Sequence, residues 1–247
     1  MADKMRDVWR GLREGLGNLW YAGEEGCILC GHGRAPLCPD CLNAYFCPQL
    51  DRCKNCGKLI RAKKIYCDDC AEGRGPSGLD KVTAWGAYAG AWKEFIWSLK
   101  FRAQPRRLEK LGYQFSEWVR GQLPPADGLV AVPMHPERLA ERGFNQAEVI
   151  VSLLHREFGI PILDGLERAL PTLSQVSLSR RDRLHNLQGA FTVKHGVDLR
   201  GKEIWLVDDV TTTGATLEEC AKVLRAAGVA AVYAVCLAAG AEKTLVP

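Results

Sequence analysis

Four Cys-x-x-Cys pairs between residues 27 and 70 constrain the fold more than any other feature of the sequence. The pairs are Cys27/Cys30, Cys38/Cys41, Cys53/Cys56 and Cys67/Cys70. A turn of this spacing directs two thiolates at one metal ion, and two such turns complete a tetrahedral site. A segment this short has little apolar core, so metal ligation has to supply much of its folding free energy. We therefore expect two structural zinc ions, with these cysteines as ligands.

The spacing favours two sequential zinc ribbons, because seven residues separate the first two pairs and ten separate the last two. A cross-braced arrangement, in which the first pair joins the third and the second joins the fourth, also satisfies the count. Disulfides are the weaker alternative, since they need an oxidising compartment, and redox Cys-x-x-Cys motifs usually occur singly. Four thiolates fill the shell of each ion, so neither Cys47 nor His32 is expected as a ligand.

Three parts are expected along the chain: 1–26, 27–75 and 76–247. Apolar residues at helical spacing predict an amphipathic helix in the first part, which would pack on the rest of the protein or bind a membrane surface or a partner. The cysteine pairs make up a double zinc-ribbon domain in the second part, and a Gly- and Pro-rich linker leads into the third. No apolar run is long enough to span a bilayer and no signal peptide is evident, so a cytoplasmic protein is expected.

The third part alternates between strand and helix patterns. Short apolar runs predict strands at 82–88, 128–133, 202–209 and 230–238, and helical periodicity predicts helices at 91–101, 106–123, 145–159 and 216–228. Asn145 can begin its helix and Gly159 can end it. This alternation predicts an α/β fold with a doubly wound, largely parallel sheet. Such sheets bind ligands at the carboxyl ends of their strands.

The segment Ile204–Thr216, with the sequence IWLVDDVTTTGAT, has the pattern of a phosphate-binding loop. An apolar strand ends in Asp208 and Asp209, and the residues that follow include Thr211, Thr212, Thr213, Gly214, Ala215 and Thr216. We expect Thr216 to cap the next helix, with Glu219 completing a capping box. Backbone N–H groups at a helix start, together with hydroxyl donors, favour a phosphate dianion.

The two carboxylates need a different partner in this interpretation. They would repel a phosphate, but they can accept hydrogen bonds from two neighbouring hydroxyl groups. A five-carbon sugar phosphate presents both features, so the segment predicts a ribose-5-phosphate site. The alternative is an acidic loop before a capped helix, without a ligand.

The sequence VDDVTTTGAT resembles the phosphoribosyl pyrophosphate (PRPP) motif of type I phosphoribosyltransferases. Together with the cysteine pairs, it makes residues 20 to 240 similar to the ComF family, which includes ComFC and GntX. The resemblance implies a phosphoribosyltransferase-like domain after the zinc ribbons. It implies that PRPP or ribose-5-phosphate binds with Mg2+, that Asp208 and Asp209 hold the ribose at the catalytic site, and that an acceptor displaces pyrophosphate.

Two further loops match the family. The segment 132–148 takes the place of its pyrophosphate loop and contains His135, Arg138 and Arg142, whose charges suit an anion; the arginines could instead form ion pairs on a helix face. The segment 172–191 resembles its mobile loop through Gln175, Arg183, Asn186 and Phe191, and Gln175 and Arg183 are further pyrophosphate candidates. Phe191 is better suited to packing than to a role in the loop. Lys100 matches a lysine of the family and is equally well explained as an exposed helix residue.

The resemblance also bears on the biological role. The family is tied to DNA uptake in natural transformation, and the net charge of +4 permits an anionic partner. DNA uptake or DNA metabolism is therefore expected, with single-stranded DNA or a protein of the competence machinery as a partner. The alternative is a protein that senses PRPP, or binds DNA or a partner, without catalysis. No base-recognition segment is identifiable, which leaves both readings open.

Overall fold

The computed structural model of the chain describes residues 26–46, 50–61, 63–102, 105–168 and 187–242. They fall into two compact units that divide between Leu42 and Asn43. This division separates the first two Cys-x-x-Cys pairs from the last two. The amphipathic helix expected near the N-terminus and Cys47 lie outside the described residues. The expected boundaries at residues 26 and 75 stay predictions.

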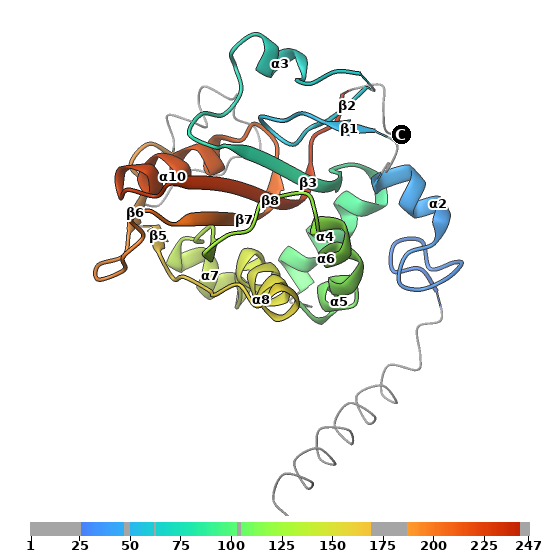
Figure 1. Ribbon diagram of the computed structural model, residues 1–247. Helices are drawn as coiled ribbons and strands as arrows, with labels where there is room; N and C mark the ends of the chain where they lie inside the picture. Colours follow the sequence, from blue (N-terminus) through green and yellow to red (C-terminus); the bar gives the residue numbers. More distant parts are fainter. Residues whose placement is uncertain (1–25, 47–49, 62, 103–104, 169–186, 243–247) are drawn as a thin grey trace, which may run out of the picture. The chain divides into compact units, whose positions relative to one another are not determined.

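The second unit is built on a parallel four-stranded sheet in the order β3-β8-β7-β4 (Figure 1). Its strands are β3 (Lys81–Ala87), β4 (Gly128–Ala131), β7 (Glu203–Thr211) and β8 (Ala231–Ala239). Most side chains of the central pair, β7 and β8, are buried, as expected for parallel strands that are covered on both faces. The predicted α/β fold with a largely parallel sheet is confirmed.

Helices cover both faces of this sheet (Figure 1). On one face, α10 (Ala215–Ala226) shares a core cluster with Ile204 and Leu206 of β7. On the other face, the ring of Trp205 lies 5.5 Å from that of Phe158 in α8 (Gln146–Phe158). Side chains alternate between the two faces along a strand, so the whole run has to be apolar.

The helix predicted at 145–159 is confirmed at both ends. The side chain of Asn145 accepts a hydrogen bond from the N–H of Ala147 at 3.1 Å, and Gly159 ends α8 with a φ of 69°. The helix predicted at 91–101 is present as α4 (Gly90–Arg102). Across the described part of the chain, no helix combines the length and the apolar character that crossing a membrane requires.

The single helix predicted at 106–123 is wrong, because the segment forms α5 (Pro105–Glu109) and α6 (Gly112–Val119). Between them, the N–H of Leu111 donates to the carbonyl of Leu108 at 3.0 Å, which is the bond of a tighter turn. Gly112 is a poor helix former and has a packing role. A methyl group there would lie 3.1 Å from Leu153 of α8, so the glycine allows α6 and α8 to approach closely.

A short antiparallel hairpin, β5 (Leu166–Arg168) with β6 (Phe191–Val193), lies beside the sheet. The sequence does not predict these strands, because three residues are too few to show an alternation. The chain between them is the segment that resembles a mobile loop. Most of that segment lies outside the described residues.

The last two Cys-x-x-Cys pairs lie in a small subdomain that packs on β3, an edge strand of the sheet. In it, β1 (Asp51–Arg52) pairs antiparallel with β2 (Leu59–Ile60). The guanidinium of Arg52 donates to the carbonyls of Ala84 and Trp85 in β3, each at 2.7 Å. An edge strand presents backbone groups that the sheet itself leaves unpaired. Arg52 donates to two consecutive carbonyls of this edge strand and joins the subdomain to the sheet.

The contribution of Arg52 to stability can be measured by substitution. Arg52→Met should lower the free energy of unfolding by about 3 kcal/mol, because two buried carbonyls lose charged donors. Urea unfolding of the metal-loaded protein measures the change. Arg120→Met is the matched control, since Arg120 forms an exposed ion pair with Glu117 and should change stability by less than about 1 kcal/mol. Equal effects of the two substitutions would contradict the assigned role.

Candidate functional site

The two aspartates lie inside β7, which is longer than the strand predicted at 202–209. Pairing with β8 continues to Thr211, which lies opposite Ala239. The carboxylate of Asp208 accepts the N–H of Asp209 at 2.8 Å, and Asp209 is 8% exposed. Successive side chains of a strand point to opposite faces of the sheet. A ligand that contacts both carboxylates therefore has to lie over the carboxyl end of β7.

The helix that follows begins at a glycine. Gly214 is the N-cap residue of α10 and has a φ of 77°, a left-handed conformation that glycine adopts without strain. The prediction that Thr216 caps the helix is wrong, because Thr216 lies in its first turn. The hydroxyl of Thr213 accepts the N–H of Ala215 at the long distance of 3.4 Å. The N-terminal N–H groups and the positive end of the helix dipole thus favour an anion beside the two aspartates.

The threonines before this cap differ in exposure. Thr211 is 4% exposed, and its hydroxyl oxygen has no hydrogen-bond partner among the described residues. Thr212 is exposed and Thr213 is half-buried. A buried hydroxyl without a partner costs about 1–3 kcal/mol. A ligand that hydrogen-bonds to Thr211 would recover part of that cost.

The segment 132–148 contains a short helix, α7 (Pro136–Arg142), which begins at His135. The ring Nδ1 of His135 accepts the N–H of Glu137 at 3.4 Å, so this histidine caps the helix. Arg138 and Arg142 are half-buried on it. Since β4 and β7 are parallel neighbours, the segment starts at the sheet edge that carries the aspartates.

Arg168, which no sequence pattern marks, lies at the same edge. Its guanidinium lies over the ring of Phe191, 5.4 Å from the centroid, and the β5–β6 register pairs these two residues. The pKa of Arg168 is lowered from its usual value, mainly by burial and also by the positive charge of Arg138. Cys220 and Asp208 act in the opposite direction. Arg168 is therefore within electrostatic reach of both α7 and the end of β7. Its position depends on pairing with a residue far along the chain, which local patterns do not reveal.

A pocket of about 610 Å³ adjoins this edge. Its lining comes from the chain after β4, from α7 and α8 and from β5, and includes Pro133, Met134, Leu139, Val151 and Arg168. None of the residues 208–216 lines it. The pocket thus lies apart from the aspartate–threonine segment. Arg168 is related to both regions, because it lines the pocket and its charge interacts with that of Asp208.

Other predicted site residues have different outcomes. Gln175, Arg183 and Asn186 lie outside the described residues, as does the side chain of Lys100. Phe191 is 2% exposed at the start of β6, which makes it a packing residue.

The paired cysteines form two groups in sequential order. Within each group all four sulfur atoms lie within 4.8 Å of one another; the groups are Cys27, Cys30, Cys38 and Cys41, and Cys53, Cys56, Cys67 and Cys70. The cross-braced alternative is therefore not adopted. No described cysteine forms a disulfide.

Glycine turns shape one pair in each group. The N–H of Gly31 donates to the carbonyl of Cys27 at 2.8 Å, and that of Gly57 donates to Cys53 at 2.9 Å. Both glycines have positive φ, 76° and 72°. This conformation closes a tight turn that directs both thiols of a pair to one side.

The geometry and chemistry of both groups fit zinc. The sulfur atoms of Cys30 and Cys38 lie 3.7 Å apart, and those of Cys56 and Cys67 lie 3.6 Å apart. A tetrahedral ion with Zn–S bonds of about 2.3 Å places its sulfurs about 3.8 Å apart. The hydrogen bond between Cys53 and Cys56 lowers the pKa of Cys53 to about 4 and raises the pKa of Cys56, so Cys53 is the thiol of this pair that loses its proton more easily. The groups are consistent with two zinc ribbons.

Comparison with known proteins extends this description. Residues 145–247 match the family described as the phosphoribosyl transferase domain. This match includes α8, β7, the aspartate–threonine segment, α10 and β8. The parallel sheet is thus that of a phosphoribosyltransferase-type fold.

Three curated relatives cover most of the chain. Competence protein F of Haemophilus influenzae is 33% identical over 72% of this chain and 80% of its own length. Competence protein ComFC of Streptococcus pneumoniae is 34% identical over 78% of this chain and 82% of its own. The DNA utilization protein YhgH of Escherichia coli is 32% identical over 75% of this chain and 88% of its own length. With its two four-cysteine groups and its phosphoribosyl transferase domain, the chain belongs to the ComF family.

Proposed function

We propose that this protein binds PRPP or ribose-5-phosphate at the carboxyl end of β7 and transfers the phosphoribosyl group to an acceptor. One observation carries the proposal. Within residues 208–216 the chain passes from two aspartates at the end of a buried parallel strand to the N-terminus of α10, with Gly214 as the cap. This short segment supplies acceptors for sugar hydroxyls and donors for a phosphate.

The 5-phosphate would bind at the start of α10. Backbone N–H groups and the helix dipole favour a dianion there, and threonine hydroxyls add donors. The residues that supply these groups are Thr211, Thr212, Thr213, Gly214, Ala215 and Thr216. Gly214 begins α10 in a left-handed conformation, so the N–H groups just after it belong to the helix N-terminus.

The ribose would lie over the end of β7, where Asp208 and Asp209 accept hydrogen bonds from its 2- and 3-hydroxyls. In the transfer, the bond from the anomeric carbon to pyrophosphate breaks with its electron pair on pyrophosphate. A nitrogen of the acceptor donates a lone pair to that carbon and loses a proton. The carbon gains positive charge on the way, which the nearby carboxylates would stabilise. Mg2+, held mainly by pyrophosphate oxygens and water, would neutralise the leaving group.

Pyrophosphate would be held from the neighbouring loops. Arg138 and Arg142 of α7 carry fixed positive charge. Arg168 adds a third guanidinium, and the charge of Arg138 lowers its pKa, which indicates that the two side chains interact. His135 would act through the helix that it caps. Gln175 and Arg183, outside the described residues, stay predictions for a loop that closes over the ligand and excludes water.

The names of the relatives support a role in DNA uptake or DNA use, as competence proteins and as a DNA utilization protein. In this role, single-stranded DNA or a protein of the competence machinery would be the partner. The second candidate is a sensor that binds PRPP without turnover and acts through such a partner. Release of pyrophosphate from PRPP with a panel of bases distinguishes the two, since a sensor binds PRPP and releases none.

Asparagine substitutions test the ribose contacts. Asp208→Asn and Asp209→Asn should each weaken PRPP binding roughly 10- to 100-fold, because a hydrogen bond to a charged group is worth about 1.5–3 kcal/mol. The double variant should bind below detection by calorimetry with Mg2+. Asp198→Asn changes an exposed aspartate before β7 and should bind normally. Equal affinity of the double variant and the unmodified chain would overturn the assignment.

A second substitution tests the pyrophosphate contact of Arg168. Arg168→Met should weaken PRPP roughly tenfold or more but leave ribose-5-phosphate unchanged, because only PRPP carries the diphosphate. Calorimetry with both ligands gives the ratio. Arg156→Met is the control, since Arg156 is exposed on α8. If both ligands lose affinity equally, Arg168 does not act on the diphosphate.

Metal analysis tests the cysteine groups. The purified chain should contain two zinc ions, one for each four-cysteine group. Cys38→Ser and Cys67→Ser should each retain one, because each removes a ligand from a different group. Inductively coupled plasma spectrometry measures the content. Less than one zinc per unmodified chain would contradict the assignment.

A further inference from the structure

The second cysteine group lies in the same compact unit as the proposed ligand segment, and two separate connections join them. The first runs through the backbone after β8. The N–H of Leu59 in β2 donates to the carbonyl of Gly240 at 3.0 Å, and the N–H of Gly240 donates to the carbonyl of Thr211 at 3.2 Å. One residue thus bonds to the zinc-ribbon side and to the ligand segment. Leu59 is fully buried, which fixes this end of the connection.

The second connection runs through the chain that leaves the last cysteine. Gly75 packs so closely on Cys70 that a methyl group there would lie 2.6 Å from the sulfur. The next residue, Pro76, is buried, and a methyl group on Gly214 would lie 2.8 Å from its ring. The hydroxyl of Ser77 then donates to Glu218 in the first turn of α10 at 2.7 Å. The segment after Cys70 therefore contacts both the cap and the first turn of the phosphate-facing helix.

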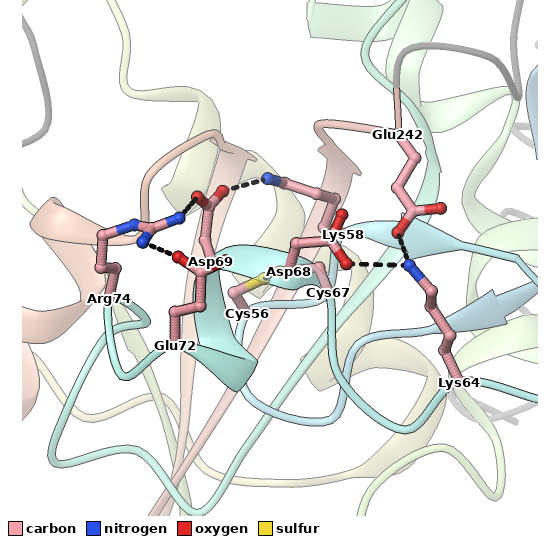
Figure 2. A network of polar contacts seen from close by, with 9 residues as sticks. All are labelled: Cys56, Lys58, Lys64, Cys67, Asp68, Asp69, Glu72, Arg74 and Glu242. Carbon is pink, nitrogen blue, oxygen red and sulfur yellow. Dashed lines mark hydrogen bonds and ion pairs between the residues drawn. The ribbon is translucent and has the colours of Figure 1, made fainter.

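Ion pairs around the group support the same arrangement (Figure 2). Lys64 lies between Asp68 at 2.9 Å and Glu242 at 3.1 Å, which links the turn that carries Cys67 and Cys70 to the chain after β8. Lys58 bonds to Asp69 of the same turn at 2.9 Å. These exposed pairs stabilise little by themselves. They orient groups that the backbone and packing contacts already hold.

We infer that the second four-cysteine group, once metal-loaded, positions the ligand segment through Gly240 on one side and Pro76–Ser77 on the other. Metal ligation fixes the chain from Cys53 to Cys70, because its small core cannot. The fixed chain then holds Thr211, Gly214 and the first turn of α10 in the conformation that receives the ligand. The identity of that ligand rests on the proposed function. The first group belongs to the other compact unit and is not part of this device.

Hydrogen exchange of the ligand-free protein tests this inference. In Cys67→Ser, the amides of residues 211–217 should exchange about tenfold faster, a change that corresponds to about 1.4 kcal/mol. Amides of β4 should stay unchanged, because they do not contact the second group. Cys38→Ser is the matched control and should leave residues 211–217 as they are. An unchanged rate in a folded Cys67→Ser, or equal acceleration by both variants, would overturn the inference.

A second pair of variants guards against failure of Cys67→Ser to fold. Pro76→Ala with Ser77→Ala retains every zinc ligand but removes the contacts with Gly214 and Glu218. Residues 211–217 should again exchange faster, and the affinity for ribose-5-phosphate should fall about fivefold or more. The single variant Ser77→Thr retains Pro76 and a hydroxyl at position 77. Its exchange rate and its affinity should match those of the unmodified chain. Unchanged exchange in the double variant, with two zinc ions bound, would contradict the positioning role.

The exchange measurement separates this inference from the proposed function. If the unmodified chain does not bind ribose-5-phosphate, the proposed function fails, while faster exchange in Cys67→Ser alone would still support the coupling. If the chain binds the sugar phosphate and the exchange of residues 211–217 is insensitive to the second group, the coupling fails and the proposed function stands.

Discussion

The pairing of β7 with β8, which continues as far as Thr211 and Ala239, is the constraint on which the site depends. Apolar side chains buried on both faces fix the position of β7, so its last residues stand at a defined sheet edge. Asp208 and Asp209 are part of that paired strand instead of a free loop. Their carboxylates are thus placed before any ligand arrives, and α10 begins only a few residues later. Acceptors and donors that suit a sugar phosphate are held in place by sheet pairing.

The subdomain that contains the second four-cysteine group joins this sheet at its edge strand β3. Arg52 satisfies carbonyls of β3, and Leu59 pairs with the chain that leaves β8. A subdomain with so few apolar residues would gain its rigidity from a metal ion bound by its four cysteines. Zinc ribbons are often regarded as appendages that recruit partners, but here the second one is continuous with the scaffold of the ligand segment. The first four-cysteine group lies in the other compact unit and is the better candidate for an independent role.

Features set by local chemistry could be predicted from the sequence, whereas those set by distant contacts could not. Apolar runs predict the four strands of the sheet, and Asn145 and Gly159 predict the two ends of α8. The short spacings between the cysteine pairs predict how the cysteines are grouped. The break before Gly112 reflects close packing on Leu153, and Arg168 is positioned by β6, a partner strand that begins more than twenty residues later in the chain. The cap of α10 was misplaced because a Ser/Thr capping box competes with a left-handed glycine, and here the close contact with Pro76 requires Gly214 at that position.

A crystal structure of the metal-loaded chain with PRPP and Mg2+ is the most direct test of our proposal that residues 208–216 hold a ribose-5-phosphate group. We expect density for the 5-phosphate at the N–H groups of residues 213–216 and for the ribose hydroxyls at Asp208 and Asp209. The diphosphate should extend toward Arg138 and Arg168. Well-ordered PRPP at another place, or an empty segment at saturating PRPP, would contradict it.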